Sequence, residues 1–188
     1  MLLAIKNMVC DRCILVVRQE LEKLGFTIQH IVLGTVQLTP EPDRPSIEKI
    51  SRVLHALGFE LLSSEKEQQV EQIKTQVIAM VHHSDLSNVR LSLISFVAEK
   101  MDKDVVYLSR LFSDAEGITI EKFIIQQKIE KVKELLEYGE LNLNEIAYRM
   151  GYSSSAHLST QFKAVTGMPP SKYKVKPTGN RKPLDQVI

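Results

Sequence analysis

The sequence predicts an α+β domain followed by an all-α domain, and three observations support this division. Short apolar and β-branched segments of strand length are confined to residues 1–62. A polar segment, SSEKEQQ, follows at residues 63–69. From residue 70 to about residue 174, apolar side chains recur at helical spacing without a convincing strand. We therefore predict a first domain at residues 1–64 and a connector or first helix at residues 65–83. A second domain is predicted at residues 84–176, and a basic, flexible tail at residues 177–188.

The composition is that of an ordinary globular protein. Of the 188 residues, 44% are hydrophobic and 25% are charged, and no apolar run reaches the roughly 18 residues of a membrane span. The N-terminus lacks the pattern of a signal peptide, so we expect a cytoplasmic protein without a membrane partner. The formal net charge is only +1, but residues 163–182 contain six Lys or Arg and no acid, which favours either a nucleic-acid partner or a solvated tail. No enzyme is predicted, because the sequence shows no Gly-rich phosphate loop and no nucleophile with a base partner.

The first domain is predicted to have the order β-α-β-β-α-β. Strand-like segments lie at residues 2–6, 26–33, 36–39 and 59–62. The helix after the first strand ends at Gly25 and has an apolar face of Ile14, Val17, Leu21 and Leu24. The second helix is expected to begin at a capping Ser46 and to end before Gly58. This order of elements is the ferredoxin-like split βαβ pattern.

The only two cysteines, Cys10 and Cys13, follow the first predicted strand with two residues between them. In a reducing compartment this spacing favours a metal site or a redox pair over a structural disulfide. Both thiols lie near a helix start, where we expect the helix dipole to lower their pKa. Two soft sulfurs without further local ligands favour Cu(I) over Zn²⁺, which takes about four ligands. A redox dithiol and a pair of idle, buried thiols remain as alternatives.

Residues 2–62 resemble the heavy-metal-associated domain of copper chaperones and metal-exporting ATPases. The matching features are the order of elements, the motif Met8-x-Cys10-x-x-Cys13, and Gly58-Phe59 at the last strand. Asn7 replaces the usual glycine and tolerates the same left-handed backbone, and Val9 replaces the usual Thr or His. The resemblance implies that Cu(I) or another soft metal ion binds to Cys10 and Cys13, with Met8 and Phe59 supporting the loop.

Two segments of the second domain are predicted to be helix-turn-helix units joined by a long helix over residues 119–139. In residues 141–174, one helix is followed by Gly151, and Ser153 or Ser154 caps the next helix. The buried positions expected in this second helix are Leu158, Phe162 and Val165. Residues 96–124 repeat the pattern: YLSRLF parallels HLSTQF, and the expected buried positions are Leu108, Leu111 and Phe112.

These features closely resemble the DNA-binding domain of the AraC/XylS family of bacterial transcription regulators over roughly residues 70–174. The segment NEIAYRMGYSSSAHLSTQFKAVTGMPPSKYK (144–174) matches the family signature nearly residue for residue. The resemblance implies two reading helices that enter major-groove segments roughly 34 Å apart. Arg110 is the predicted base contact, because Arg pairs bidentately with guanine. The alternative is a surface Arg that is either solvated or paired with Asp114. The full set of predicted DNA contacts is Val106, Ser109, Arg110, Ser154, Ser155, His157, Thr160, Lys163 and Lys172.

The leading hypothesis is a bacterial, sequence-specific transcription regulator whose partner is a double-stranded promoter. It could act as a homodimer and, if an activator, would contact RNA polymerase. Cu(I) bound to the first domain would change its affinity for DNA. One alternative is a metal or thiol carrier whose helical domain is a docking module. The other is a constitutive DNA-binding protein whose first domain only dimerises. His82 and His83 are either surface histidines or further metal ligands.

Overall fold

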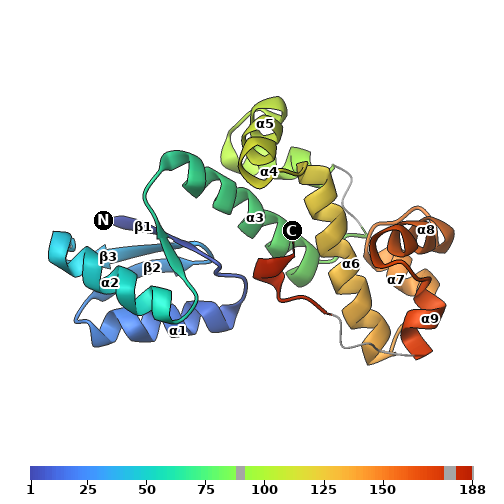
Figure 1. Cartoon of the computed structure of the whole chain (residues 1–188), viewed down its shortest axis with the longest axis horizontal. Coiled ribbons are helices and arrows are strands. Elements are labelled where there is room, and N and C mark those ends of the chain that lie inside the picture. Colours follow the sequence, from blue (N-terminus) through green and yellow to red (C-terminus); the bar gives the residue numbers. More distant parts are fainter. Residues whose placement is uncertain (88–91, 176–180, 188) are drawn as a thin grey trace. The chain divides into compact units, whose positions relative to one another are not determined.

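Four antiparallel strands form a sheet in the order β2-β3-β1-β4 in the N-terminal part of the chain (Figure 1). The strands are β1 (Leu2–Lys6), β2 (Thr27–Val32), β3 (Thr35–Thr39) and β4 (Glu60–Leu62). Two helices complete this part: α1 (Asp11–Lys23) follows β1, and α2 (Arg44–Ala56) follows β3. Strands and helices therefore follow one another along the chain in the predicted order.

One face of this sheet forms a core with the two helices. Alternate residues of a strand point to the same face, and in β1 and β3 these are Leu3, Ile5, Val36 and Leu38. The helices contribute Val17 and Leu21 from α1 and Ile50 and Leu54 from α2. Helix α2 begins three residues earlier than predicted, because its cap is Asp43 and not Ser46. The Asp43 carboxylate accepts a hydrogen bond from the Ser46 backbone N–H at 3.0 Å.

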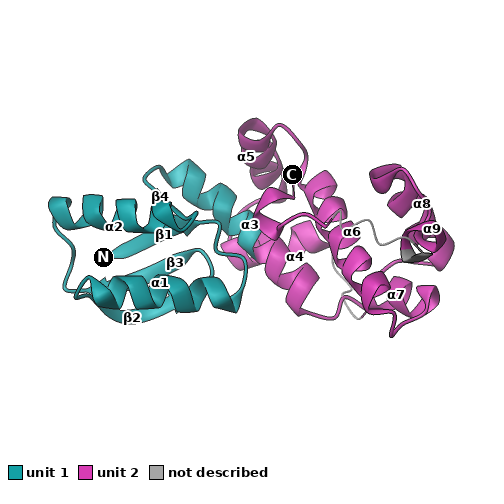
Figure 2. Ribbon diagram, turned by 60° about the horizontal axis from the view of Figure 1, so that its bottom comes forward, with its two compact units in different colours: residues 1–75 teal, residues 76–188 magenta. Residues whose placement is uncertain are grey.

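The chain divides into two units, Met1–Thr75 and Gln76–Ile188, and helix α3 (Glu65–His83) contains the boundary (Figure 2). The computed structural model describes residues 1–87, 92–175 and 181–187. The first unit extends past the predicted end at residue 64, because the first turns of α3 contact the loops of this unit. Glu71 accepts a hydrogen bond from Asn7, and Thr75 lies against Gly34.

Helix α6 (Ile120–Tyr138) is the central element of the second unit (Figure 1). It contacts α4, α5, α8 and α9. The other helices are α4 (Leu93–Met101), α5 (Val105–Glu116), α7 (Leu143–Arg149), α8 (Ser155–Thr166), α9 (Pro170–Val175) and the 3-10 helix η1 (Leu184–Gln186). Among the described residues, no helix is both long enough and apolar enough to traverse a lipid bilayer.

Helices α5 and α8 repeat the same local pattern at an offset of 50 residues. Their N-caps are Asp104 and Ser154, and their C-caps are Gly117 and Gly167 in the left-handed conformation. The fully buried positions are Leu108 and Phe112 in α5 and Leu158 and Phe162 in α8. Two predictions of burial were wrong: Leu111 is only partly buried, and Val165 is 44% exposed, because each lies beside the stripe that faces the core.

The turns before these two helices differ in the residue that adopts the left-handed backbone. In the second helix-turn-helix motif Gly151 does so, with φ +68°, between α7 and α8. In the first helix-turn-helix motif Asp102 takes this conformation, with φ 51° and ψ 48°, at the end of α4. Aspartate is one of the few non-glycine residues that visit this region routinely. The first helix-turn-helix unit therefore forms its turn without a glycine.

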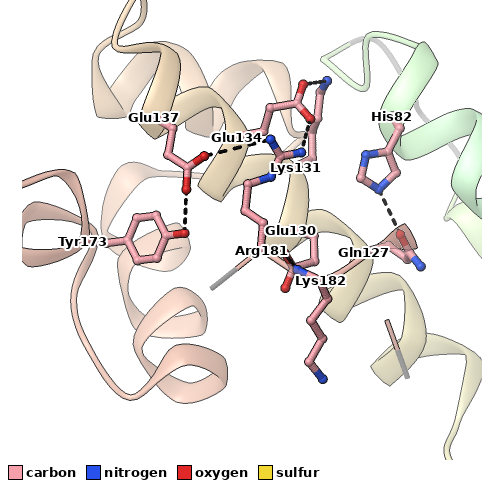
Figure 3. Close-up of polar contacts among 9 residues, drawn as sticks. All are labelled: His82, Gln127, Glu130, Lys131, Glu134, Glu137, Tyr173, Arg181 and Lys182. Atoms are coloured by element: carbon pink, nitrogen blue, oxygen red, sulfur yellow. Dashed lines mark hydrogen bonds and ion pairs between the residues drawn. The ribbon is translucent and has the colours of Figure 1, made fainter. Parts of the chain in front are cut away.

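A C-terminal segment, residues 181–187, lies against α6 (Figure 3). Arg181 donates to Glu134 at 2.6 Å, and the backbone N–H of Lys182 donates to Glu130 at 3.2 Å. The carbonyl of Leu184 accepts a hydrogen bond from Gln127 at 3.2 Å. Part of the segment predicted as a flexible tail is thus held to the helical unit, while residues 177–180 and 188 of that prediction lie outside the described residues.

Candidate functional site

The two cysteines lie where the loop after β1 enters α1. Cys10 is the N-cap residue of α1, and Cys13 lies in its first turn. Their sulfurs are 3.5 Å apart and both thiols are free. A disulfide would require about 2.05 Å between the sulfurs. The pair is therefore a preformed dithiol with both sulfurs on the same side of the loop.

Apolar side chains shield one side of this dithiol. Met8 is 1% exposed and Phe59 is 7% exposed, and Cys13 packs against the cluster that contains them. Burial raises the pKa of the Cys13 thiol above its ordinary value. We had expected the helix dipole to lower it, but the loss of hydration of the thiolate is the larger effect here. The side chain of Met8 lies in the core, so it anchors the cysteine-containing loop to the core.

The donor set at this loop consists of two sulfurs. Two thiolates that each lie about 2.3 Å from a single ion can be up to about 4.6 Å apart, so a separation of 3.5 Å is compatible with a shared ion. Within the described ranges, no group of three or more His, Cys, Asp or Glu side chains could hold a metal ion. The residues present thus fit a soft ion of low coordination number better than one that needs four protein ligands.

The N-terminal turns of α5 expose the side chains that were predicted to contact DNA. Val106 is 57% exposed, Arg110 is exposed, and Ser109 is half-buried because its hydroxyl donates to the Val105 carbonyl at 2.8 Å. Among the described residues, no ion pair joins Arg110 to Asp114, so the structure does not show the paired form of the alternative, while a solvated surface Arg remains compatible with its exposure. The sequence reasoning missed Tyr107, which is 44% exposed beside Val106; its place in the first turn was the available signal.

The N-terminal turns of α8 carry mainly short side chains with hydroxyl groups. Ser154 caps the helix by accepting from the His157 N–H at 3.1 Å, and Ser155 is half-buried. His157 is exposed, and its ring lies edge-on to Tyr152 with Nδ1 3.1 Å from the Ser153 hydroxyl. Thr160 is exposed and donates to the Ala156 carbonyl at 3.0 Å. These groups suit hydrogen bonds to phosphate oxygens and contacts with thymine methyl groups.

Basic side chains flank this second exposed helix end. Lys163 on α8 and Lys172 on α9 are both exposed, whereas the side chain of Lys174 lies outside the described residues. Within the part of the chain that the structure describes, neither of these two lysines forms an ion pair with an acidic side chain. Exposed cations of this kind attract phosphate without reading base sequence.

His82 is a buried structural residue of the second unit. Its Nε2 lies 2.9 Å from Oε1 of Gln127, and the side chain is 9% exposed (Figure 3). Burial lowers the pKa of His82 to about 4. The prediction that His82 is a surface histidine was therefore wrong, because its ring is buried against Gln127 of α6, whereas His83 is exposed.

Comparison with known proteins places the helical residues in a recognised class. Residues 97–176 match a family model described as a helix-turn-helix domain. A solved structure titled the C-terminal domain of AraT, a response regulator from Geobacillus stearothermophilus, is 30% identical with a TM-score of 0.51. The match covers 60% of this chain and 88% of that structure.

Two curated proteins show similarity in sequence. The Msm operon regulatory protein of Streptococcus mutans is 26% identical over 147 residues, which is 77% of this chain and 52% of that protein. The HTH-type transcriptional activator RhaS of Escherichia coli is 33% identical over 67 residues, which is 36% of this chain and 24% of RhaS. The matched region thus spans about half of the first relative and about a quarter of the second.

Proposed function

Because the chain belongs, through residues 97–176, to the helix-turn-helix proteins of the AraC family, we propose that it is a sequence-specific, DNA-binding transcription regulator. The observation that carries this proposal is the repeat of two capped helices, α5 and α8, on the common helix α6. Each presents an exposed N-terminal end above a fully buried leucine and phenylalanine. Such helices bind in the major groove, where base edges are distinguishable.

The two helix ends differ in what they can recognise. Arg110 on α5 supplies a bidentate donor that suits O6 and N7 of guanine. The exposed groups at the start of α8 are mainly hydroxyls and an imidazole, with Lys163 and Lys172 close by in the sequence. We therefore assign base discrimination mainly to α5, and phosphate contacts, which fix orientation and register, mainly to α8 and α9. The partner is double-stranded promoter DNA, bound by one chain or by a homodimer, and RNA polymerase is the further partner if the protein activates.

Arg110→Ala should weaken binding to the preferred DNA sequence by about 1–3 kcal/mol and relax the preference at one base pair, because a guanine contact is lost. The DNA is first selected from a random library with the wild-type chain, and affinity is then measured at several salt concentrations. Arg44→Ala is the matched control, since it removes the same charge from the exposed start of α2 in the other unit. Equal affinity and equal base preference in both variants would contradict the assignment of Arg110.

A finer proposal concerns the first unit, which we assign to the ferredoxin-like class as a metal-responsive domain. Its support is the order of elements and the sheet order β2-β3-β1-β4, together with the 3.5 Å separation of two free thiols at the start of α1. Cys10 and Cys13 would hold a soft metal ion such as Cu(I), while Met8 and Phe59 keep the loop packed against the core. The ion would alter DNA affinity through a difference in binding between two states of the chain.

Cys10→Ser and Cys13→Ser should each abolish tight Cu(I) binding, because hydroxyl oxygen is a hard ligand that Cu(I) does not favour. The wild-type chain, purified without oxygen, should bind about one Cu(I) per chain and change its DNA affinity about 5- to 150-fold on loading, the usual range of allosteric coupling. DNA affinity of the serine variants should not respond to Cu(I).

Other outcomes of the same titration identify the competing functions. A wild-type chain whose DNA affinity is unchanged by Cu(I), with no effect of the serine variants on target genes, indicates a constitutive DNA-binding protein. A chain that binds Cu(I) but shows no preference for any DNA sequence, and no steep salt dependence, indicates a carrier with a docking domain.

A further inference from the structure

Asn7 lies at the start of the cysteine loop, which we define as residues 7–13, and has an unusual backbone conformation. Its φ is +71°, in the left-handed region that few residues other than glycine adopt. Two hydrogen bonds hold it there. Its side-chain Nδ2 donates to the Gly58 carbonyl at 2.9 Å, and its backbone N–H donates to Oε1 of Glu71 at 2.9 Å. On its other side, the Asn7 carbonyl lies 4.0 Å from the Cys13 sulfur.

Glu71 reaches this loop from a distant part of the chain. It lies on α3, 64 residues after Asn7, and is 8% exposed. A hydrogen bond from a backbone N–H to a carboxylate is charge-assisted and about twice as strong as a neutral one. Loss of this acceptor would leave the N–H of a strained, partly buried residue without its partner.

A second contact fixes the same part of α3 to the first unit. A Cβ atom added to Gly34, in the turn between β2 and β3, would lie 3.2 Å from the Thr75 hydroxyl oxygen. Gly34 has φ +81°, and its carbonyl accepts from the Ile5 N–H at 2.9 Å. The first part of α3 therefore contacts the first unit at two places: Glu71 binds the cysteine loop, and Thr75 lies against the turn at Gly34. The same helix continues to His83, within the helical unit.

We propose that Glu71 is a positioning residue of the cysteine loop, and that α3 responds through it to what Cys10 and Cys13 hold. The second clause of this proposal rests on the metal response proposed above. A metal ion that binds the Cys13 sulfur moves it relative to the Asn7 carbonyl, and the peptide groups of Asn7 transmit this movement to the Glu71 carboxylate. Because Glu71 belongs to the helix that enters the helical unit, a change at the loop then alters the start of that helix.

The test compares three variants of the full chain: Glu71→Ala, Glu71→Gln and Gln72→Ala. Glu71→Gln keeps an oxygen that can accept from Asn7, and Gln72 is the exposed neighbour on the same helix. Three quantities are measured: the rate at which iodoacetamide alkylates the two cysteines, the affinity for Cu(I) in competition with a chelator, and the ratio of DNA affinities with and without Cu(I).

We expect Glu71→Ala to alkylate several-fold faster and to bind Cu(I) roughly 10-fold more weakly, which is the usual effect of losing a group that orients metal ligands. The ratio of its DNA affinities should fall towards one. Glu71→Gln should change all three measurements much less than Glu71→Ala, because it keeps a weaker, neutral hydrogen bond to Asn7, and Gln72→Ala should remain close to the wild-type chain. Rescue by glutamine separates positioning by a hydrogen bond from a role of charge.

The outcomes that overturn the proposal differ from those that overturn the metal response. If Glu71→Ala alkylates at the wild-type rate, Glu71 does not position the loop, whatever the metal does. If the wild-type chain binds no Cu(I), the metal response and the second clause fail, while alkylation still decides the first clause. Far-UV circular dichroism shows whether Glu71→Ala folds; if it does not, Glu71→Asp, which withdraws the carboxylate by one methylene, carries the same expectations.

Discussion

Phe162→Ala is expected to destabilise the helical unit by about 3–5 kcal/mol, the usual cost of deleting a large core side chain. Phe162 on α8 is fully buried, and its ring lies edge-on to Tyr173 with 5.5 Å between ring centroids. The Tyr173 hydroxyl donates to Glu137 on α6 at 2.9 Å, so α8, α9 and α6 meet at this point (Figure 3). The free energy of unfolding is measured by urea titration followed by circular dichroism, and loss of DNA binding should accompany it.

The matched control for this substitution lies three residues further along the same helix. Val165 is 44% exposed, so Val165→Ala should change the free energy of unfolding by no more than about 0.5–1 kcal/mol. A loss below about 1 kcal/mol in Phe162→Ala, or equal losses in the two variants, would show that α8 is not packed on this phenylalanine.

Lowering the pH from 7 to 4.5 should destabilise the helical unit through His82. The ordinary histidine pKa is 6.5, and burial lowers that of His82 to about 4, so between these values the unfolded chain binds more protons than the folded one. Stability therefore rises with pH across this window, and it is lost as the pH falls towards 4. A difference of about 2.5 pKa units corresponds to at most about 3.4 kcal/mol.

His82→Gln isolates this effect from the carboxylates that also titrate below pH 5. The glutamine amide can still donate to Gln127, but it does not take up a proton at these pH values. The charged or titratable neighbours Lys131, Glu134 and His83 stay in place in this variant. The free energy of unfolding of the wild-type chain should fall by about 2–3 kcal/mol more than that of the variant between pH 7 and pH 4.5. Parallel pH profiles would show that His82 is hydrated in the folded chain.

Local sequence signals predicted most of the secondary structure. Gly117, Gly139 and Gly167 end helices because each adopts a left-handed backbone that other residues avoid, and all three were visible in the sequence. The strands after Gly25 and Gly58 were equally clear. Burial was less predictable at the edge of a helical stripe, where Val165 is exposed although its spacing places it near Phe162.

At the candidate sites too, the sequence predicted positions along the chain better than burial. The spacing of Cys10 and Cys13 placed two thiols together, and the helical period placed Arg110 on the exposed side of α5. The pKa of Cys13 could not be predicted, because it depends on the burial of the thiol by side chains from other elements. Tyr107 was not among the predicted contacts, although it lies in the exposed first turn of α5.

By itself, the sequence determined the order of strands and helices, the two capped reading helices and the position of the dithiol, because these depend on neighbours within about one or two turns of the chain. Only the tertiary structure decided what distant residues do to one another. It placed Glu71 against Asn7, buried His82 against Gln127, and joined Arg181 to Glu134. Partners separated by 45 to 64 residues follow no local period, since their contacts arise only when whole elements pack.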